Sequence, residues 1–231
     1  MKTVIPTFAL LLLSLSLGGC PPTEPFIDGL PLVTVETSAG SFVIETNPDR
    51  APITVENFLI YVEDGFYDGL IFHRVVPNFV IQGGGFLPDL TPKPGRPPIA
   101  NESRNGLSNA QYTVAMARTD DPNSASSQFF VNVVDNPGLD PTIDAQGYAV
   151  FGRVIEGTDV VQAISRVETA TENGFMDVPV EDVVILSTTM QMGEPRLAPE
   201  WEFFFADFQF RAQSSLREII LLLIQNSIVG N

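Results

Sequence analysis

The stretch Phe72-His73-Arg74-Val75-Val76-Pro77-Asn78-Phe79-Val80-Ile81-Gln82-Gly83-Gly84 holds two short apolar runs joined by Pro77-Asn78, a pair typical of turns. Apolar runs bounded by proline, asparagine and glycine predict β-strands, here over Leu70–Val76 and Phe79–Gln82. Side chains alternate between the two faces of a strand, so Val80 and Gln82 are expected on the same side. One face of this segment therefore combines an apolar and a polar group.

A second strand of the same kind is predicted over Gln128–Val133. Its side chains divide into two sets that face opposite ways. The wholly apolar set predicts a buried core face, and the mixed set predicts the face that carries a functional site. The apolar set is Phe129, Val131 and Val133, and the mixed set is Gln128, Phe130 and Asn132.

The surrounding sequence predicts a mainly β fold. A β-hairpin is expected with its turn at Ser38–Gly40, and an amphipathic helix is expected from Pro52 to Gly65. A second helix is expected with Thr158 as its N-cap. Together these elements predict a closed eight-stranded antiparallel β-barrel capped by two α-helices. The remaining strands are predicted at Tyr112–Ala117, Tyr148–Val154 and Val183–Ser187.

The segment Phe72–Gly84 resembles the signature of the cyclophilin-type peptidyl-prolyl cis-trans isomerases, with Phe-His-Arg, a following Pro-x-Phe and a closing Gln-Gly-Gly. Met116–Phe130 is similar to the central segment of that family, and Tyr148–Gly152 is similar to its closing strand. These blocks stand in order within residues 31–190, which we assign to the isomerase domain. The resemblance implies an enzyme that isomerises X-Pro bonds in unfolded or partly folded polypeptides, assists their folding and uses no metal or organic cofactor.

The chemistry of the reaction explains the residue types. Isomerisation crosses the ~18–20 kcal/mol barrier of amide resonance and breaks no covalent bond. A catalyst needs an apolar seat for the proline ring and a donor that favours the twisted amide. The resemblance implies that Arg74 is this donor and that Gln82 is the second catalytic residue. It also implies a set of substrate-binding residues, namely Phe79, Val80, Met116, Ala117, Arg118, Gln128, Phe130, Leu139 and Tyr148.

Three positions depart from the pattern of the family. Gly138 stands where the family has Trp or Phe beside the pocket, Val80 stands where a larger Met is common, and Tyr148 stands where many eukaryotic members have His. These departures put cyclosporin sensitivity in doubt. Gly138 and Val80 also favour an alternative in which the fold binds proline peptides or a partner with little turnover, whereas the intact Arg74 favours the enzyme. Taken singly, each aromatic residue of the site could equally be a packing residue of the core.

His73 is the only histidine of the chain, and it is expected on the strand face opposite Arg74. The reaction requires no general base, so we predict a structural role for His73. Cys20 is the only cysteine. With no second histidine or second thiol, we expect neither a zinc site nor a Cys-His pair.

Residues 1–19 have the pattern of an export signal, with Lys2 before an apolar stretch that ends at Leu17-Gly18-Gly19-Cys20. The stretch is shorter than the ~20 residues that span a bilayer as a helix. The placement of Cys20 resembles the lipobox of bacterial lipoproteins, which implies acylation of its thiol, and the proline-rich residues 20–30 predict a tether. We expect a protein that is lipid-anchored in the bacterial cell envelope and faces the periplasm. A secretory signal with a chance cysteine is the alternative.

The acidic composition restricts the partners. The chain has 12 basic and 28 acidic residues and a formal net charge of -16. This charge disfavours nucleic acid and anionic lipid headgroups, which leaves lipid chains as the membrane attachment. Residues 191–231 contain clustered aromatic residues and a short apolar run, and they predict a helical extension packed on the barrel. A surface for a partner or for the bilayer is the alternative.

Overall fold

The computed structural model describes residues 26–27, 29–194 and 196–197. Gly29–Glu194 form one compact unit. In a second unit, β1 (Phe26–Ile27) pairs antiparallel with β12 (Arg196–Leu197). The predicted signal peptide, Cys20 and most of the predicted C-terminal extension lie outside the described residues. Within the described part of the chain, no helix combines the length and the apolar character needed to cross a membrane.

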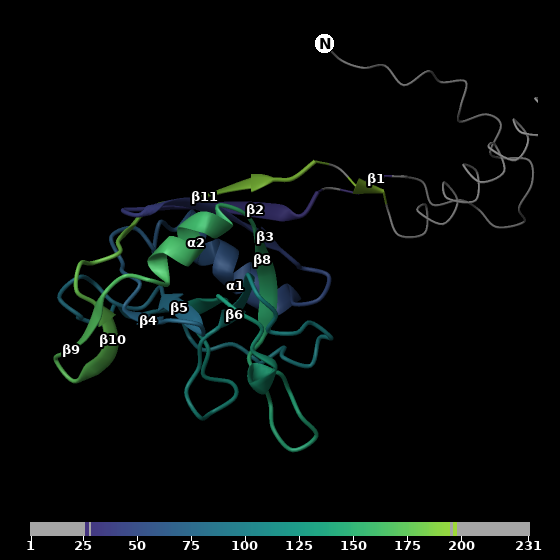
Figure 1. Ribbon diagram of the computed structural model, residues 1–231. Coiled ribbons are helices and arrows are strands. Elements are labelled where there is room, and N and C mark those ends of the chain that lie inside the picture. The colour runs from purple at the N-terminus through teal and green to yellow at the C-terminus, as the bar shows by residue number, and fades with distance from the viewer. Residues whose placement is uncertain (1–25, 28, 195, 198–231) are drawn as a thin grey trace, which may run out of the picture. The chain divides into compact units, whose positions relative to one another are not determined.

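The compact unit is built on one eight-stranded sheet with the strand order β11-β2-β3-β8-β6-β7-β5-β4 (Figure 1). Neighbouring strands pair antiparallel throughout. The strands are β2 (Pro31–Thr37), β3 (Gly40–Thr46), β4 (Arg74–Val76), β5 (Val80–Gly83), β6 (Thr113–Met116), β7 (Phe129–Asn132), β8 (Val150–Glu156) and β11 (Ile185–Met192). The prediction of a mainly β fold with two helices is confirmed.

The prediction of a closed barrel is not confirmed. The end strands β4 and β11 form no continuous ladder, and the two edges of the curled sheet meet at an isolated bridge between Ile71 and Val184. Gly69 has φ 79, in the left-handed region, and the segment that follows it bonds with residues 183–185 before β4 begins. Residues 69–72, which lie outside any regular strand, bond with residues 183–185, so the predicted strand Leu70–Val76 is shortened to Arg74–Val76 and no continuous ladder joins the two edges of the sheet.

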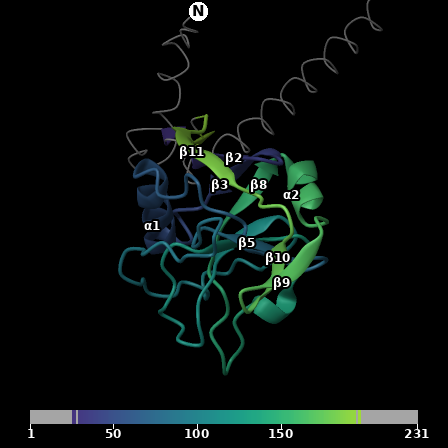
Figure 2. The ribbon, with the colours of Figure 1, turned by 90° about the vertical axis from the view of Figure 1, so that its left-hand side faces the viewer.

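Both helices contribute buried side chains to the main core. Figure 2 shows α1 (Pro52–Glu63) and α2 (Thr158–Ile164) on opposite sides of strands β2, β3 and β8. Phe58 of α1 is fully buried, and its ring lies 5.5 Å from that of Phe129 and 4.9 Å from that of Phe151. Offset and edge contacts between aromatic rings stabilise a core beyond the area that they bury. This packing makes the inner face the structural core.

The two helices begin in different ways, and the sequence predicted only part of each start. Pro52 begins α1 as predicted, and the carboxylate of Glu102 accepts hydrogen bonds from the backbone N–H of Ile53 at 3.2 Å and of Thr54 at 2.8 Å. The N-cap of α2 is Gly157, with φ 74, and Thr158 is the first helical residue. The prediction of Thr158 as N-cap was wrong by one residue, because the chain enters this helix in a left-handed conformation that glycine adopts without strain.

A two-stranded hairpin, β9 (Thr169–Glu172) and β10 (Phe175–Pro179), stands outside the main sheet. It packs against β4 and lies beside β4 and β5 in Figure 1. Its turn is Asn173-Gly174, with φ values of 48 and 87. The sequence analysis did not predict this hairpin. Asn-Gly is nevertheless typical of two-residue hairpin turns, in which both central residues have positive φ.

Candidate active site

Residues of the candidate site form a row across the outer face of the sheet. Register pairs place Arg74 opposite Gln82, Gln82 opposite Phe130, and Phe130 opposite Ala115. Directly opposite residues of antiparallel strands share a face, so the side chains from β4, β5, β7 and β6 stand next to one another. The sheet thus brings a cation, an amide and an aromatic ring into line.

The apolar part of this face is a cluster separate from the main core. Its buried members are Val80, Ala115, Phe130 and Val150. The neighbouring residues Phe129 and Val131 belong instead to the main core. The predicted alternation along this strand is confirmed. Partly buried side chains complete the cluster, and they are Phe79, Leu107, Ala117, Leu139 and Tyr148.

The polar part of the face combines one partly exposed cation with a pair of amides. The Arg74 side chain is 38% exposed, so its donors are accessible from solvent. Among the described residues, its guanidinium donates no hydrogen bond, and its one ion pair is with Asp177 at 3.8 Å. Gln82 Nε2 donates to Gln128 Oε1 at 3.0 Å. This bond fixes the orientation of both amides beside the apolar cluster.

Arg118 holds the wall of the site with all three of its guanidinium nitrogens. They donate to the backbone carbonyls of Gly147 at 3.2 Å, Thr119 at 2.8 Å and Gln146 at 2.7 Å. The guanidinium also lies 4.5 Å from the ring centroid of Tyr148, which meets the ring of Phe130 edge-on at 5.6 Å. These contacts show that Arg118 supports Tyr148, and its part in substrate binding stays a prediction.

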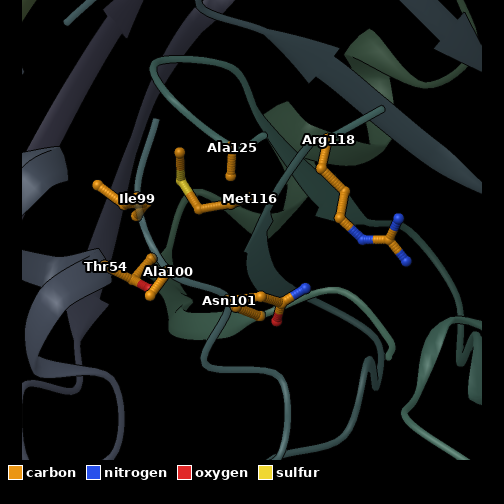
Figure 3. A pocket seen from close by; sticks show the side chains of 8 residues that line it. Thr54, Ile99, Ala100, Asn101, Met116, Arg118 and Ala125 are labelled. Atoms are coloured by element: carbon orange, nitrogen blue, oxygen red, sulfur yellow. The ribbon is translucent and has the colours of Figure 1, made fainter. Parts of the chain in front are cut away.

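Met116 does not lie in the apolar cluster around Phe130. It is 1% exposed and packs in the main core, because its register partner is Phe129 and the two share the inner face. Figure 3 shows Met116 in a small pocket opposite Thr54 and Ile99, with the guanidinium of Arg118 directed away from both. The cavity volume of about 10 Å³ has room for roughly one water molecule. Met116, which was predicted to bind substrate, therefore lies in the main core and not in the cluster around Phe130.

A buried chain of asparagines supports the aromatic wall, and sequence reasoning missed most of it. Asn136 Nδ2 donates to the backbone carbonyl of Phe79 at 3.0 Å and to Asn132 Oδ1 at 2.7 Å. Asn132 Nδ2 donates to Asn109 Oδ1 at 3.2 Å, and Asn109 donates to Asp140, the residue after Leu139. Burial raises the pKa of Asp140, but hydrogen bonds from Ser108 and Asn109 outweigh it, so the pKa is lowered. The network ties the backbone at Phe79 to Asp140, the residue that follows Leu139.

His73 is almost fully enclosed by other residues. His73 is buried against Phe86, with ring centroids 4.5 Å apart, and its Nδ1 has no hydrogen-bond partner among the described residues. Burial and the adjacent charge of Arg74 lower the pKa of His73 to about 4.

Gly138 lies in the 3₁₀ helix η2 (Pro137–Leu139), where an added Cβ would meet no described atom within 4 Å. The wall beside Leu139 therefore has open space.

The chain is similar to known isomerases over most of its described length. The family model of cyclophilin type peptidyl-prolyl cis-trans isomerase/CLD matches residues 32–190. Peptidyl-prolyl cis-trans isomerase cyp18 of Streptomyces antibioticus is 58% identical over 158 residues, which cover 67% of this chain and 95% of the relative. Peptidyl-prolyl cis-trans isomerase B of Escherichia coli is 49% identical over 162 residues, which cover 69% of this chain and 99% of the relative.

Solved structures share the fold. A cyclophilin type peptidyl-prolyl cis-trans isomerase of Cryptosporidium parvum superposes with a TM-score of 0.62 at 24% identity, covering 71% of this chain and 98% of that one. A crystal structure of the same enzyme in the presence of the dipeptide Ala-Pro superposes with a TM-score of 0.61 at 25% identity, covering 69% and 98%.

Proposed function

This chain belongs to the cyclophilin-type peptidyl-prolyl cis-trans isomerase family, and on that premise we propose that it isomerises X-Pro bonds in proteins outside the cytoplasm and so assists their folding. It is an enzyme of the cyclophilin type. The single observation that carries the assignment of residues is the row of Arg74, Gln82 and Phe130 on one face.

Arg74 is proposed as the donor that stabilises the twisted amide. When the X-Pro bond rotates out of planarity, the prolyl nitrogen regains its lone pair and becomes a hydrogen-bond acceptor. An arginine side chain carries five N–H donors, and that of Arg74 is 38% exposed, so substrate can reach them. A donor that bonds the twisted amide better than the planar one lowers the barrier.

The Phe130 cluster is proposed as the seat of the proline ring. Phe130 lies at its centre, with Phe79, Leu139 and Tyr148 as partly exposed walls. The bonded pair of Gln82 and Gln128 lies at the edge between this seat and Arg74. This arrangement suits a proline ring on the apolar side and the peptide backbone on the polar side. The use of Ala-Pro with a related enzyme supports a substrate of this class.

The test is the replacement of Arg74. Loss of one preorganised donor costs ~2.7–4 kcal/mol of barrier, so Arg74→Ala is expected to lower kcat/KM about a hundred- to a thousandfold in a protease-coupled assay on a proline peptide. Arg166→Ala removes another exposed arginine as a control and should leave turnover unchanged. A well-folded Arg74→Ala protein that keeps most of its turnover would contradict the assigned role.

Membrane attachment through Cys20 is the second part of the proposal. It rests on the export pattern of residues 1–19 and on Cys20 being the only thiol, which a lipid acceptor requires. Cys20→Ser is expected to release the protein from membranes into the soluble envelope fraction, or to leave its precursor uncleaved. Fractionation with a high-salt wash measures this. A processed variant that stays on the membrane would point instead to an anchor in residues 198–231.

A further inference from the structure

The β9–β10 hairpin reaches the candidate site, although it adds no strand to the main sheet. It packs against β4, the strand on which Arg74 lies. The ring of Phe175 on β10 meets Phe86 at 5.2 Å, and Phe86 in turn covers His73 at 4.5 Å. This aromatic stack seats the hairpin directly beside the residue that precedes Arg74.

Val178 anchors the same strand more deeply. Its side chain is 1% exposed and packs with Ile71 and Leu90 in a cluster distinct from the main core. Burial of a valine side chain contributes roughly 1.5–3 kcal/mol, so this contact is strong enough to hold β10 in place. The position of the residue before Val178 is thereby determined.

That residue, Asp177, has an uncommon backbone conformation. Its φ is 61, and the register of the hairpin shifts between Phe175 and Val178. A residue other than glycine in the left-handed region carries a conformational cost, although aspartate bears it better than most. Such conformations persist where the surrounding structure requires them, and they are enriched at functional sites. The register shift re-aims the Asp177 side chain relative to a regular strand.

The carboxylate of Asp177 faces the guanidinium of Arg74. Oδ2 lies 3.8 Å from Nε, and the two side chains are 40% and 38% exposed. An exposed pair at this distance contributes little to folding stability. Four of the five N–H donors of arginine are on its terminal nitrogens, and an interaction on the Nε side leaves those four for a substrate.

We propose that Asp177 is a positioning residue for Arg74, which holds the guanidinium by its Nε side so that its terminal nitrogens face the bound proline peptide. This inference rests on the proposed role of Arg74 as the donor to the twisted amide. Orientation before the reaction is what makes a donor effective in the transition state, so the effect of Asp177 lies in kcat more than in substrate binding.

The test uses Asp177→Asn in the full chain, because asparagine has the same shape and tolerates positive φ while it lacks the charge. We expect kcat to fall about three- to tenfold with KM unchanged, and the midpoint of denaturant unfolding to stay close to that of the parent chain. Glu172→Gln removes an exposed carboxylate from the opposite strand of the same hairpin and should leave kcat unchanged. Asp177→Glu, which restores the charge, should recover part of the loss.

A double-mutant cycle separates this inference from the proposed function. In an Arg74→Lys background, Asp177→Asn should have a smaller effect than in the parent chain, because the fork that it orients is gone. Equal effects in both backgrounds, or an Asp177→Asn protein with unchanged kcat, would overturn the positioning role. An Arg74→Ala protein that keeps its turnover would instead overturn the proposed function itself.

Discussion

The two faces of strand β7 differ in what completes them. Phe129 and Val131 point inward and are fully buried in the main core, where the rings of Phe58 and Tyr67 contact Phe129. Phe130 points outward and is 3% exposed; it packs with Val80, Ala115 and Val150, and partly buried side chains and a pair of bonded amides lie beside this cluster. Consecutive residues of one strand therefore have different roles: Phe129 packs in the main core, and Phe130 faces the candidate site. The inner face is closed by the protein itself, whereas the outer face is left for a ligand to complete.

The largest effects on stability and turnover are expected from replacing Phe129 or Phe130. Phe129→Ala is expected to lower the free energy of unfolding by about 3–5 kcal/mol, the usual cost of a large cavity in a core. Phe130→Ala should cost less stability and should lower kcat/KM of the folded protein by about tenfold or more, since it removes the centre of the proline seat. Urea titration and peptide turnover measure the two effects. Loss of turnover per folded molecule in Phe129→Ala, without loss in Phe130→Ala, would reverse the assignment of the faces.

The burial of His73 beside Arg74 predicts how the stability of the fold depends on pH. The pKa of His73 is lowered to about 4 in the folded chain, against 6.5 in the unfolded chain. The stability contributed by neutral His73 is thus fully present above pH 6.5, and it is lost as the pH falls toward 4.

Between pH 7 and pH 5 the expected loss is about 2 kcal/mol of unfolding free energy, and it should be absent in His73→Gln. Urea titrations of both proteins at the two pH values measure the difference, and the carboxylates common to both cancel. Equal losses in the two proteins would show that His73 titrates normally and is not enclosed as the structure has it.

Arg118 tests whether the outer face is held together from its rim. Arg118→Met removes three hydrogen bonds to backbone carbonyls and the cation over Tyr148. We expect the free energy of unfolding to fall by about 1–2 kcal/mol and KM to rise several-fold as Tyr148 loses its position beside Phe130. Substrate titration separates KM from kcat. A selective loss of kcat with normal KM would indicate that Arg118 acts on the reacting bond instead of on the wall.

The smallest expected effect concerns Gly138, the open position in the wall. Gly138→Trp has room at its Cβ and should tighten binding of a cyclosporin-like macrocycle by about 1 kcal/mol, roughly fivefold, with only modest change in peptide turnover. Inhibitor titration of both proteins measures the gain. Tight inhibition of the parent chain, or no gain in the variant, would show that residue 138 does not form this wall.

The sequence by itself determined the family, most of the strands and helices, and the alternation along β7. These features are local. Pro52 begins α1, and the turn of the β2–β3 hairpin falls where Ser38–Gly40 predicts it. Phe129 and Phe130 face opposite sides of the sheet because successive side chains of a strand alternate. The Asn173-Gly174 turn is an equally local signal, because Asn-Gly readily adopts the positive φ values that a two-residue hairpin turn requires.

Only the tertiary structure decided which distant groups meet. Glu102 caps α1 from 48 residues away, and Asn136 and Phe79 are joined across 57 residues. The sequence alone does not state the register that pairs Met116 with Phe129, the isolated bridge at which the edges of the sheet meet, or the φ of 61 at Asp177, whose carboxylate lies 3.8 Å from Arg74 Nε. Local propensity acts over a few residues, whereas register, closure and the pairing of remote charges depend on how whole strands pack.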